Sequence, residues 1–193
     1  MSKIKNYFET SSKNIEKLSI LEPNIQKACD AILKCKKQGN KILVAGNGGS
    51  CSDAEHFVGE LQCTYKAPNR QPISAISLAS LPAALTAWSN DFGFLTYFKR
   101  QVEAHGKEND ILFLITTGGG NEKTGASMSL VEAAREAKKR KLLIVSLVGK
   151  SGGILKDISD IVIHVDNETT SFIQEAHISI LHCICEMLEE HLS

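Results

Sequence analysis

The sequence Lys41-Ile-Leu-Val-Ala45-Gly-Asn-Gly-Gly-Ser50 joins a short apolar run to a glycine-rich turn. An apolar run of this length that leads directly into glycines is typical of a strand buried inside a parallel sheet. Glycines let the backbone turn sharply and approach a ligand closely. A helical pattern over 50–63 follows, and the free N–H groups at a helix start favour anions. The segment therefore predicts a strand–turn–helix unit whose turn faces a ligand.

The same kind of apolar run recurs four times, and helical patterns separate the runs. The runs cover 73–78, 111–115, 142–147 and 161–165, and the later helical patterns cover 81–104, 129–140, 151–157 and 170–191. Alternation of this kind predicts right-handed βαβ crossovers. We therefore expect an α/β fold: one Rossmann-like domain over residues 1–193, with a mainly parallel five-stranded sheet flanked by helices.

Two amphipathic helical patterns, over 3–19 and 23–38, precede the first strand. Proline at position 23 suits the first turn of the second helix, and Gly39 suits its end. Residues 1–38 are therefore expected to form an N-terminal helical extension that packs on the domain or on a partner subunit.

Ligands of open parallel sheets bind at the carboxyl ends of the strands, so the loops after the apolar runs are candidate sites. Thr116-Thr-Gly-Gly-Gly120 follows the third run, and its hydroxyls and bare backbone predict a phosphate cradle. Ser129 and Glu132 predict a capping box for the next helix. Ser89-Asn-Asp-Phe-Gly93 interrupts a helical pattern, which is typical of a turn or an N-cap.

Two nucleotide-binding motifs are disfavoured at the first glycine loop. Cys51 stands where the third glycine of a dinucleotide-binding pattern belongs, and no Gly-Lys-Ser/Thr follows as a P-loop requires. The alternative to a ligand site here is a tight strand–helix turn that binds nothing.

His56 and Glu60 lie four residues apart on the helix that starts at this loop, so both side chains share one helix face. An imidazole and a carboxylate in that relation can hold a divalent metal or act as an acid/base pair. Gln174 and His182 lie on the last, mostly apolar helix, about 12 Å apart along its axis. They serve one site only if their side chains converge, and otherwise serve neighbouring sites in an oligomer.

Composition excludes several classes of protein. The 193 residues contain 22 Lys and Arg and 22 Asp and Glu, so no broad basic field is available for nucleic acid or an anionic membrane. The polar N-terminus has no secretory h-region, and no apolar stretch has the length of a membrane span. Six cysteines without a C-x-x-C pair are expected to be reduced thiols in a cytoplasmic protein.

These motifs together resemble bacterial phosphoheptose isomerases, which belong to the sugar isomerase (SIS) domain superfamily. The resemblance covers nearly the whole chain. It rests on the segments 45–50, 53–57, 90–93, 100–103, 149–153 and 173–178, with Glu60 and His182.

The resemblance implies an aldose–ketose isomerase. It implies interconversion of sedoheptulose 7-phosphate and D-glycero-D-manno-heptose 7-phosphate through an enediolate, on the route to activated heptoses for lipopolysaccharide or capsule. It also implies a homotetramer with active sites at subunit contacts, and one zinc ion per subunit.

By position, the resemblance assigns the site residues. Glu60 and His182 match the acid/base pair. The matched metal ligands are His56, Glu60, Gln174 and His182. The matched substrate contacts are Asn47, Gly48, Gly49, Ser50, Glu60, Asn90, Asp91, Thr116, Thr117, Gly118, Ser127 and Gln174.

The chain departs from the family pattern at the phosphate loop and in the segment 170–175. Gly118 replaces a serine, about six residues are inserted before Ser127, and Phe172 replaces an arginine. Isomerisation of a different sugar phosphate is therefore an alternative. A non-catalytic binding or assembly protein and a sugar-phosphate-sensing regulator are further alternatives, but both would tolerate loss of the acid/base residues present here.

Overall fold

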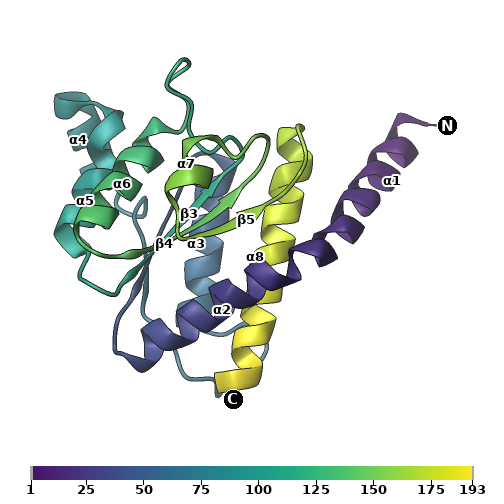
Figure 1. The fold of residues 1–193 in the computed structure, drawn as a ribbon, viewed down its shortest axis with the longest axis horizontal. Coiled ribbons are helices and arrows are strands. Elements are labelled where there is room, and N and C mark those ends of the chain that lie inside the picture. Colours follow the sequence, from purple (N-terminus) through teal and green to yellow (C-terminus); the bar gives the residue numbers. More distant parts are fainter. Residues whose placement is uncertain (1, 193) are drawn as a thin grey trace.

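The apolar run before the first glycine loop forms β1 (Ile42–Gly46), which lies between β2 and β3 in a parallel sheet. The computed structural model describes residues 2–192. Within them, one five-stranded sheet has the order β2-β1-β3-β4-β5, and all neighbouring strands are parallel (Figure 1). The other strands are β2 (Ala75–Ser77), β3 (Ile111–Thr116), β4 (Leu143–Val148) and β5 (Ile161–His164). The predicted fold class is confirmed.

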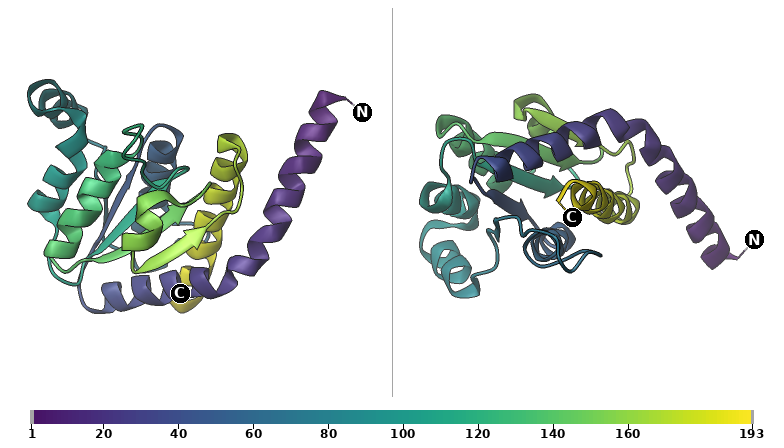
Figure 2. Two further views of the ribbon diagram at one scale, coloured as in Figure 1. Left: turned by 45° about the horizontal axis from the view of Figure 1, so that its top comes forward. Right: turned by 90° about the horizontal axis from the view of Figure 1, so that it is seen from below.

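Helices cover both faces of the sheet, because alternate residues of β1 enter two separate hydrophobic cores. Ile42 and Val44 belong to one core, and Leu43 and Ala45 belong to the other. The helices of the first core are α2 (Glu22–Lys37), α3 (Gly49–Gln62) and α8 (Thr170–Leu192). Those of the second are α5 (Tyr97–His105), α6 (Met128–Lys139) and α7 (Gly153–Ile158). Figure 2 shows the same arrangement tilted so that its top comes forward, and from below.

The segment predicted as helical over 81–104 forms two helices. α4 (Pro82–Phe92) ends at Gly93, and a short 3₁₀ turn, η2 (Phe94–Thr96), leads into α5. Gly93 has φ +83°, a conformation that glycine adopts without the steric cost of a side chain. The predicted turn over 89–93 is therefore wrong in its extent. Asn90 and Asp91 belong to the last turn of α4, and the chain leaves the helix at the glycine.

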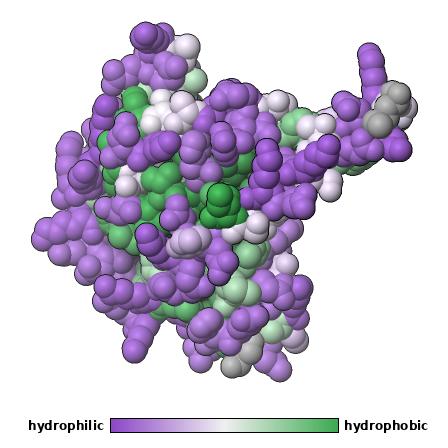
Figure 3. Space-filling model, turned by 45° about the vertical axis from the view of Figure 1, so that its right-hand side comes forward, coloured by the Kyte–Doolittle hydropathy of each residue, from purple (hydrophilic) through white to green (hydrophobic). Residues whose placement is uncertain are grey.

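The N-terminal segment forms α1 (Lys3–Glu16), a 3₁₀ turn η1 (Lys17–Leu21) and α2. α1 projects from the body of the molecule (Figure 1). It contacts the start of α8, where the Tyr7 hydroxyl and the Ser11 hydroxyl each donate to the Glu175 carboxylate at 2.5 Å. Ile4 and Phe8 remain 72% and 67% exposed, and Figure 3 shows apolar surface on the face from which α1 projects.

All six cysteines are free thiols. Among residues 2–192, no helix combines the length and the apolar character that crossing a membrane would require.

Candidate functional site

The first glycine loop has the tight geometry that its sequence predicts. A Cβ at Gly46 would lie 2.1 Å from the Ser50 carbonyl oxygen, so no larger residue fits there. Gly48 has φ +59° and is the N-cap of α3. Gly48 and Gly49 are exposed and Asn47 is half-buried, whereas the Ser50 side chain is buried. The backbone of this loop is thus open to a ligand at Gly48 and Gly49.

The structure brings His56 and Glu60 of α3 together with His182 of α8. The Nε2 atoms of His56 and His182 are 3.0 Å apart, and His56 Nε2 is 3.5 Å from Glu60 Oε1. His182 is more than 120 positions away from the other two residues in sequence, and it meets them because α3 and α8 pack side by side (Figure 1). We call His56, Glu60 and His182 the central cluster.

The two oxygens of the Glu60 carboxylate lie in different surroundings. Oε1 faces His56, whereas Oε2 is buried and has no hydrogen-bond partner in the described part of the chain. A buried carboxylate oxygen without a partner is unfavourable unless a ligand, a proton or an ion completes it. The central cluster is therefore chemically incomplete as it stands.

Imidazole nitrogens and carboxylate oxygens are the ligand types that zinc binds, so the donor set of the central cluster fits this metal in kind. Its geometry is not preformed, since no group of three or more His, Cys, Asp or Glu among residues 2–192 is arranged to hold a metal ion. The spacing of 3.0 Å between the two imidazole nitrogens is that of a hydrogen bond. Metal binding would require these side chains to shift.

Gln174 lies apart from the central cluster. A Cβ at Gly49 would lie 2.4 Å from Gln174 Nε2, which places the amide directly against the first turn of α3. His56 follows Gly49 by seven residues on the same helix, or about two turns. The assignment of Gln174 as a metal ligand or a substrate contact stays a prediction.

The second glycine loop is held together by its own hydroxyl groups. The Thr116 and Ser127 hydroxyls are hydrogen bonded at 2.9 Å, and Thr116 Oγ1 also accepts the N–H groups of Gly118 and Gly119 at 3.3 Å. Thr116 is buried, whereas Thr117 and Gly118 are half-exposed. Within this loop, Thr117 and Gly118 are therefore the more accessible of the predicted phosphate contacts.

The two glycine loops adjoin each other. β1 and β3 are neighbours in the sheet, and Asn47 Nδ2 donates to Ser129 Oγ at 3.3 Å. Ser129 lies inside α6, and the N-cap is Ser127, which has left-handed backbone angles and no side-chain cap bond. The predicted capping box at Ser129 and Glu132 is therefore wrong, because the helix already begins at Met128 and Ser127 takes the N-cap position.

Asn90 and Asp91 are not part of the central cluster within this chain. Both side chains are exposed at the end of α4, where Asn90 Nδ2 donates to Asp91 Oδ1 at 2.8 Å. α4 lies at the far side of the molecule from α8 (Figures 1 and 2). Their assignment as substrate contacts of one complete site stays a prediction.

Two residues beside the central cluster were not singled out from the sequence. The Tyr65 ring lies 5.7 Å from the His182 ring, centroid to centroid. Burial raises the pKa of Asp53, although the nearby charge of His56 lowers this pKa by a smaller amount. Asp53 Oδ2 has no hydrogen-bond partner among residues 2–192. The position of Asp53 one turn before His56 is a sequence signal, whereas Tyr65 reaches the site only through packing.

A family model described as the SIS domain matches residues 6–149. The phosphoheptose isomerase of Campylobacter jejuni is 38% identical over 187 residues, which cover 97% of this chain and 97% of the relative. The chain belongs to the phosphoheptose isomerase family.

Solved structures of the phosphoheptose isomerase family agree with this assignment. The enzyme GmhA from Neisseria gonorrhoeae is 31% identical with a TM-score of 0.88, and the match covers 97% of both chains. The phosphoheptose isomerase from Francisella tularensis is 36% identical with a TM-score of 0.91, covering 98% of this chain and all of that one. The similarity therefore includes the N-terminal helices as well as the sheet.

Proposed function

We propose that this protein is an aldose–ketose isomerase that interconverts sedoheptulose 7-phosphate and D-glycero-D-manno-heptose 7-phosphate in activated-heptose biosynthesis. The observation that carries the proposal is the convergence of the Glu60 carboxylate and the His182 imidazole, next to His56. Family membership over the full chain supports the same substrate class.

The chemistry requires that a proton moves between neighbouring carbons while negative charge develops on oxygen. Glu60 is the proposed base, because its Oε2 atom is free of internal partners in the described part of the chain. His182 is the proposed partner that protonates the oxygen or the adjacent carbon. The exposed backbone at Gly48 and Gly49 is proposed to hold the sugar. Thr117 and Gly118 are proposed to bind its phosphate.

Zinc is the proposed cofactor, held by His56, Glu60 and His182, with Gln174 turning away from Gly49 to join them. When bound, it would polarise the substrate carbonyl and stabilise the developing oxyanion. Equilibrium dialysis followed by metal analysis tests this without an activity assay. We expect one zinc per chain in the unmodified protein and a clear loss of zinc after His56→Ala or His182→Ala. Equal zinc content in all three proteins would rule out this site.

We propose a homotetramer with sites at subunit contacts, because the single chain leaves predicted site residues apart. Its free cysteines support the proposal that the protein acts in the cytoplasm. Asn90 and Asp91 lie on an exposed helix end beside Phe92 and Leu95, which are 66% and 52% exposed. Large apolar side chains that lie exposed next to each other are typical of a protein–protein interface. A neighbouring subunit covering this end of α4 would bring Asn90 and Asp91 into a shared site.

A different sugar phosphate is the second candidate substrate, and one observation favours it. The exposed turn over 121–126 stands between Thr116 and Ser127, closed by hydrogen bonds between Asn121 and Ala126 and between Gly125 and Asn121. Extra backbone beside the proposed phosphate site changes the room available to the substrate. The length or the stereochemistry of the sugar is the property that this turn would affect.

The deciding experiment incubates the purified protein with ketose phosphates of five to seven carbons, with and without a chelator. We expect the seven-carbon ketose to be converted fastest. Glu60→Gln should lower turnover by about 10²–10⁴-fold while the protein stays folded. Glu55→Gln removes the same charge from an exposed position of the same helix and should keep normal turnover. Near-normal turnover of Glu60→Gln would refute the assigned base, and conversion of no ketose phosphate would favour a binding protein.

A further inference from the structure

The edge of the sheet at which the strands begin carries an excess of positive charge. The last turns of α2 and α6 and the turns before β1, β3, β4 and β5 form this edge, over residues 34–41, 107–110, 136–141 and 159–160. They contain nine Lys and Arg but four Asp and Glu, although the whole chain has 22 of each kind. Because the strands are parallel, this basic edge is opposite the edge with the glycine loops.

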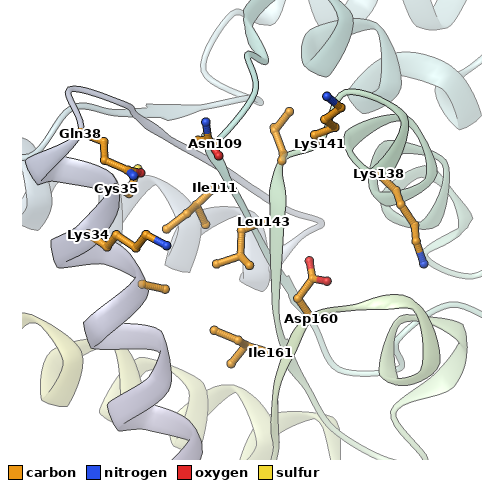
Figure 4. A pocket seen from close by; sticks show the side chains of 12 residues that line it. Lys34, Cys35, Gln38, Asn109, Ile111, Lys138, Lys141, Leu143, Asp160 and Ile161 are labelled. Atoms are coloured by element: carbon orange, nitrogen blue, oxygen red, sulfur yellow. The ribbon is translucent and has the colours of Figure 1, made fainter.

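A cavity of about 520 Å³ opens in the basic edge (Figure 4). Its floor is apolar and consists of Ala31 of α2 and three strand residues, Ile111, Leu143 and Ile161. Leu143 and Ile161 are only half-buried, although β1 and β3 of the same sheet are buried along their whole length. The volume is within the range of about 300–1,000 Å³ that is usual for small-molecule sites. The packing of α2 thus leaves an apolar floor accessible here.

Amines stand on both walls of this cavity. Lys34 of α2 points its Nζ across the hollow, and Lys138 and Lys141 lie on the opposite side at the end of α6 (Figure 4). Lys34 and Lys138 have no ion pair among residues 2–192, whereas Lys141 pairs with Glu108 at 3.2 Å. The one acidic residue that lines the cavity, Asp160, accepts the Ile144 N–H at 2.8 Å. Asp160 keeps its negative charge, so the three lysines against Asp160 and Glu108 leave the cavity with a net charge of about +1.

Neutral hydrogen-bonding groups complete the lining, since Gln38 and Asn109 place side-chain amides at the rim. Amides can pair with the donors and acceptors of a heterocycle or a sugar. The lining thus combines a flat apolar surface, amides and amines within one cavity.

We propose that this cavity is a second ligand site, separate from the isomerase site, which binds a small organic phosphate of the nucleotide class. The ring would lie on the apolar floor, and the phosphates would meet Lys34, Lys138 and Lys141. Inorganic phosphate alone uses only the amines, and an uncharged ring uses only the floor. A molecule with both parts matches the whole lining, and it does not compete with a sugar phosphate at the opposite edge.

The test is isothermal titration of the full-length protein with ADP, with adenosine and inorganic phosphate as probes that each lack one feature. We expect saturable ADP binding that is at least tenfold tighter than binding of either probe and that weakens as salt is raised. Saturating sugar phosphate should not displace ADP. Glu60→Gln should bind ADP normally, which separates this proposal from the proposed isomerase activity.

Charge-removing variants locate the site. Lys34→Gln combined with Lys138→Gln should weaken ADP binding by about 2- to 25-fold, because each exposed ion pair contributes up to about fivefold. Lys27→Gln removes the same charge from an exposed position of α2 outside the cavity and should leave ADP binding unchanged. Thermal unfolding of each variant checks that the fold is intact.

Three results of the titrations with the unmodified protein would overturn the proposal. These are the absence of saturable ADP binding, equal affinity for inorganic phosphate and ADP, and displacement of ADP by the sugar phosphate. The second would indicate a non-selective anion surface, and the third would place the nucleotide at the isomerase site. Unchanged ADP affinity in the double lysine variant would also contradict it.

Discussion

Glu189, near the end of α8, should be one of the most sensitive stabilising residues in the chain. Its carboxylate accepts the backbone N–H groups of three consecutive residues, 65–67, at 3.0–3.1 Å. Arg70 Nε lies 3.4 Å from Glu189 Oε1, and these two side chains are 2% and 9% exposed. Arg70 also donates to the carbonyl oxygens of Glu60 and Leu61, at 2.5 and 3.1 Å. The pair thus connects α8 to the end of α3 that carries the proposed base.

Glu189→Gln removes the charge at nearly constant volume. Loss of one partner from a buried ion pair costs about 3–5 kcal/mol. Glutamine keeps one oxygen as an acceptor, so we expect the lower end, about 3 kcal/mol of the free energy of unfolding. For a chain of this length, 1 kcal/mol corresponds to about 2–4 °C in Tm. The Tm should therefore fall by about 6–12 °C.

Thermal unfolding followed by circular dichroism, at one protein concentration for all variants, measures this change. Glu190→Gln removes the same charge at the next, exposed position and should change stability by no more than about 0.5 kcal/mol. Equal Tm values for the two variants would show that the buried carboxylate adds nothing, and the reasoning from the ion pair would fail.

The effect of Glu189→Gln should also depend on pH. Burial raises the pKa of Glu189, but hydrogen bonds from the backbone amides of residues 65–67 and the charge of Arg70 lower it by more. The folded-state pKa is thus below the unfolded value, and the stabilisation is present above the unfolded pKa. It is lost as the pH falls through the folded-state pKa. The Tm difference from the unmodified protein should therefore shrink in acid.

Two further predictions concern a glycine and a buried histidine. Gly119→Ala should lower the free energy of unfolding by at least about 2 kcal/mol in urea titrations, because Gly119 has φ +67° and a Cβ would lie 1.7 Å from the Gly152 carbonyl oxygen. Gly118→Ala, whose Cβ meets no atom within 4 Å, is its stability control, and equal effects of the two would contradict the steric argument. Burial lowers the pKa of His177 to about 4, although the Val148 backbone acts in the opposite direction. Stability should therefore fall by up to about 3 kcal/mol as the pH drops from about 6.5 to 4, and His177→Leu should flatten this slope when urea unfolding is measured at both ends of the range.

Local sequence was sufficient for most of the secondary structure. The five apolar runs form strands within about two residues of their predicted bounds, because a buried parallel strand requires such a run. Where the local prediction was wrong, one or a few residues decided the outcome. Gly93 ends α4 through its positive φ, and Ser127, with left-handed backbone angles, stands at the N-cap of α6 in place of the predicted Ser129.

The α/β class, the two glycine loops and the pairing of His56 with Glu60 could be predicted from the residues, because each follows from patterns within a few positions along the chain. The folded chain was needed to show that His182 joins this pair, that Gln174 lies against Gly49, and that a cavity with lysines on its walls opens at the opposite edge. These relations depend on how α2, α3 and α8 pack on the sheet. Side-chain volumes across the whole core set that packing, and no local stretch of residues encodes it.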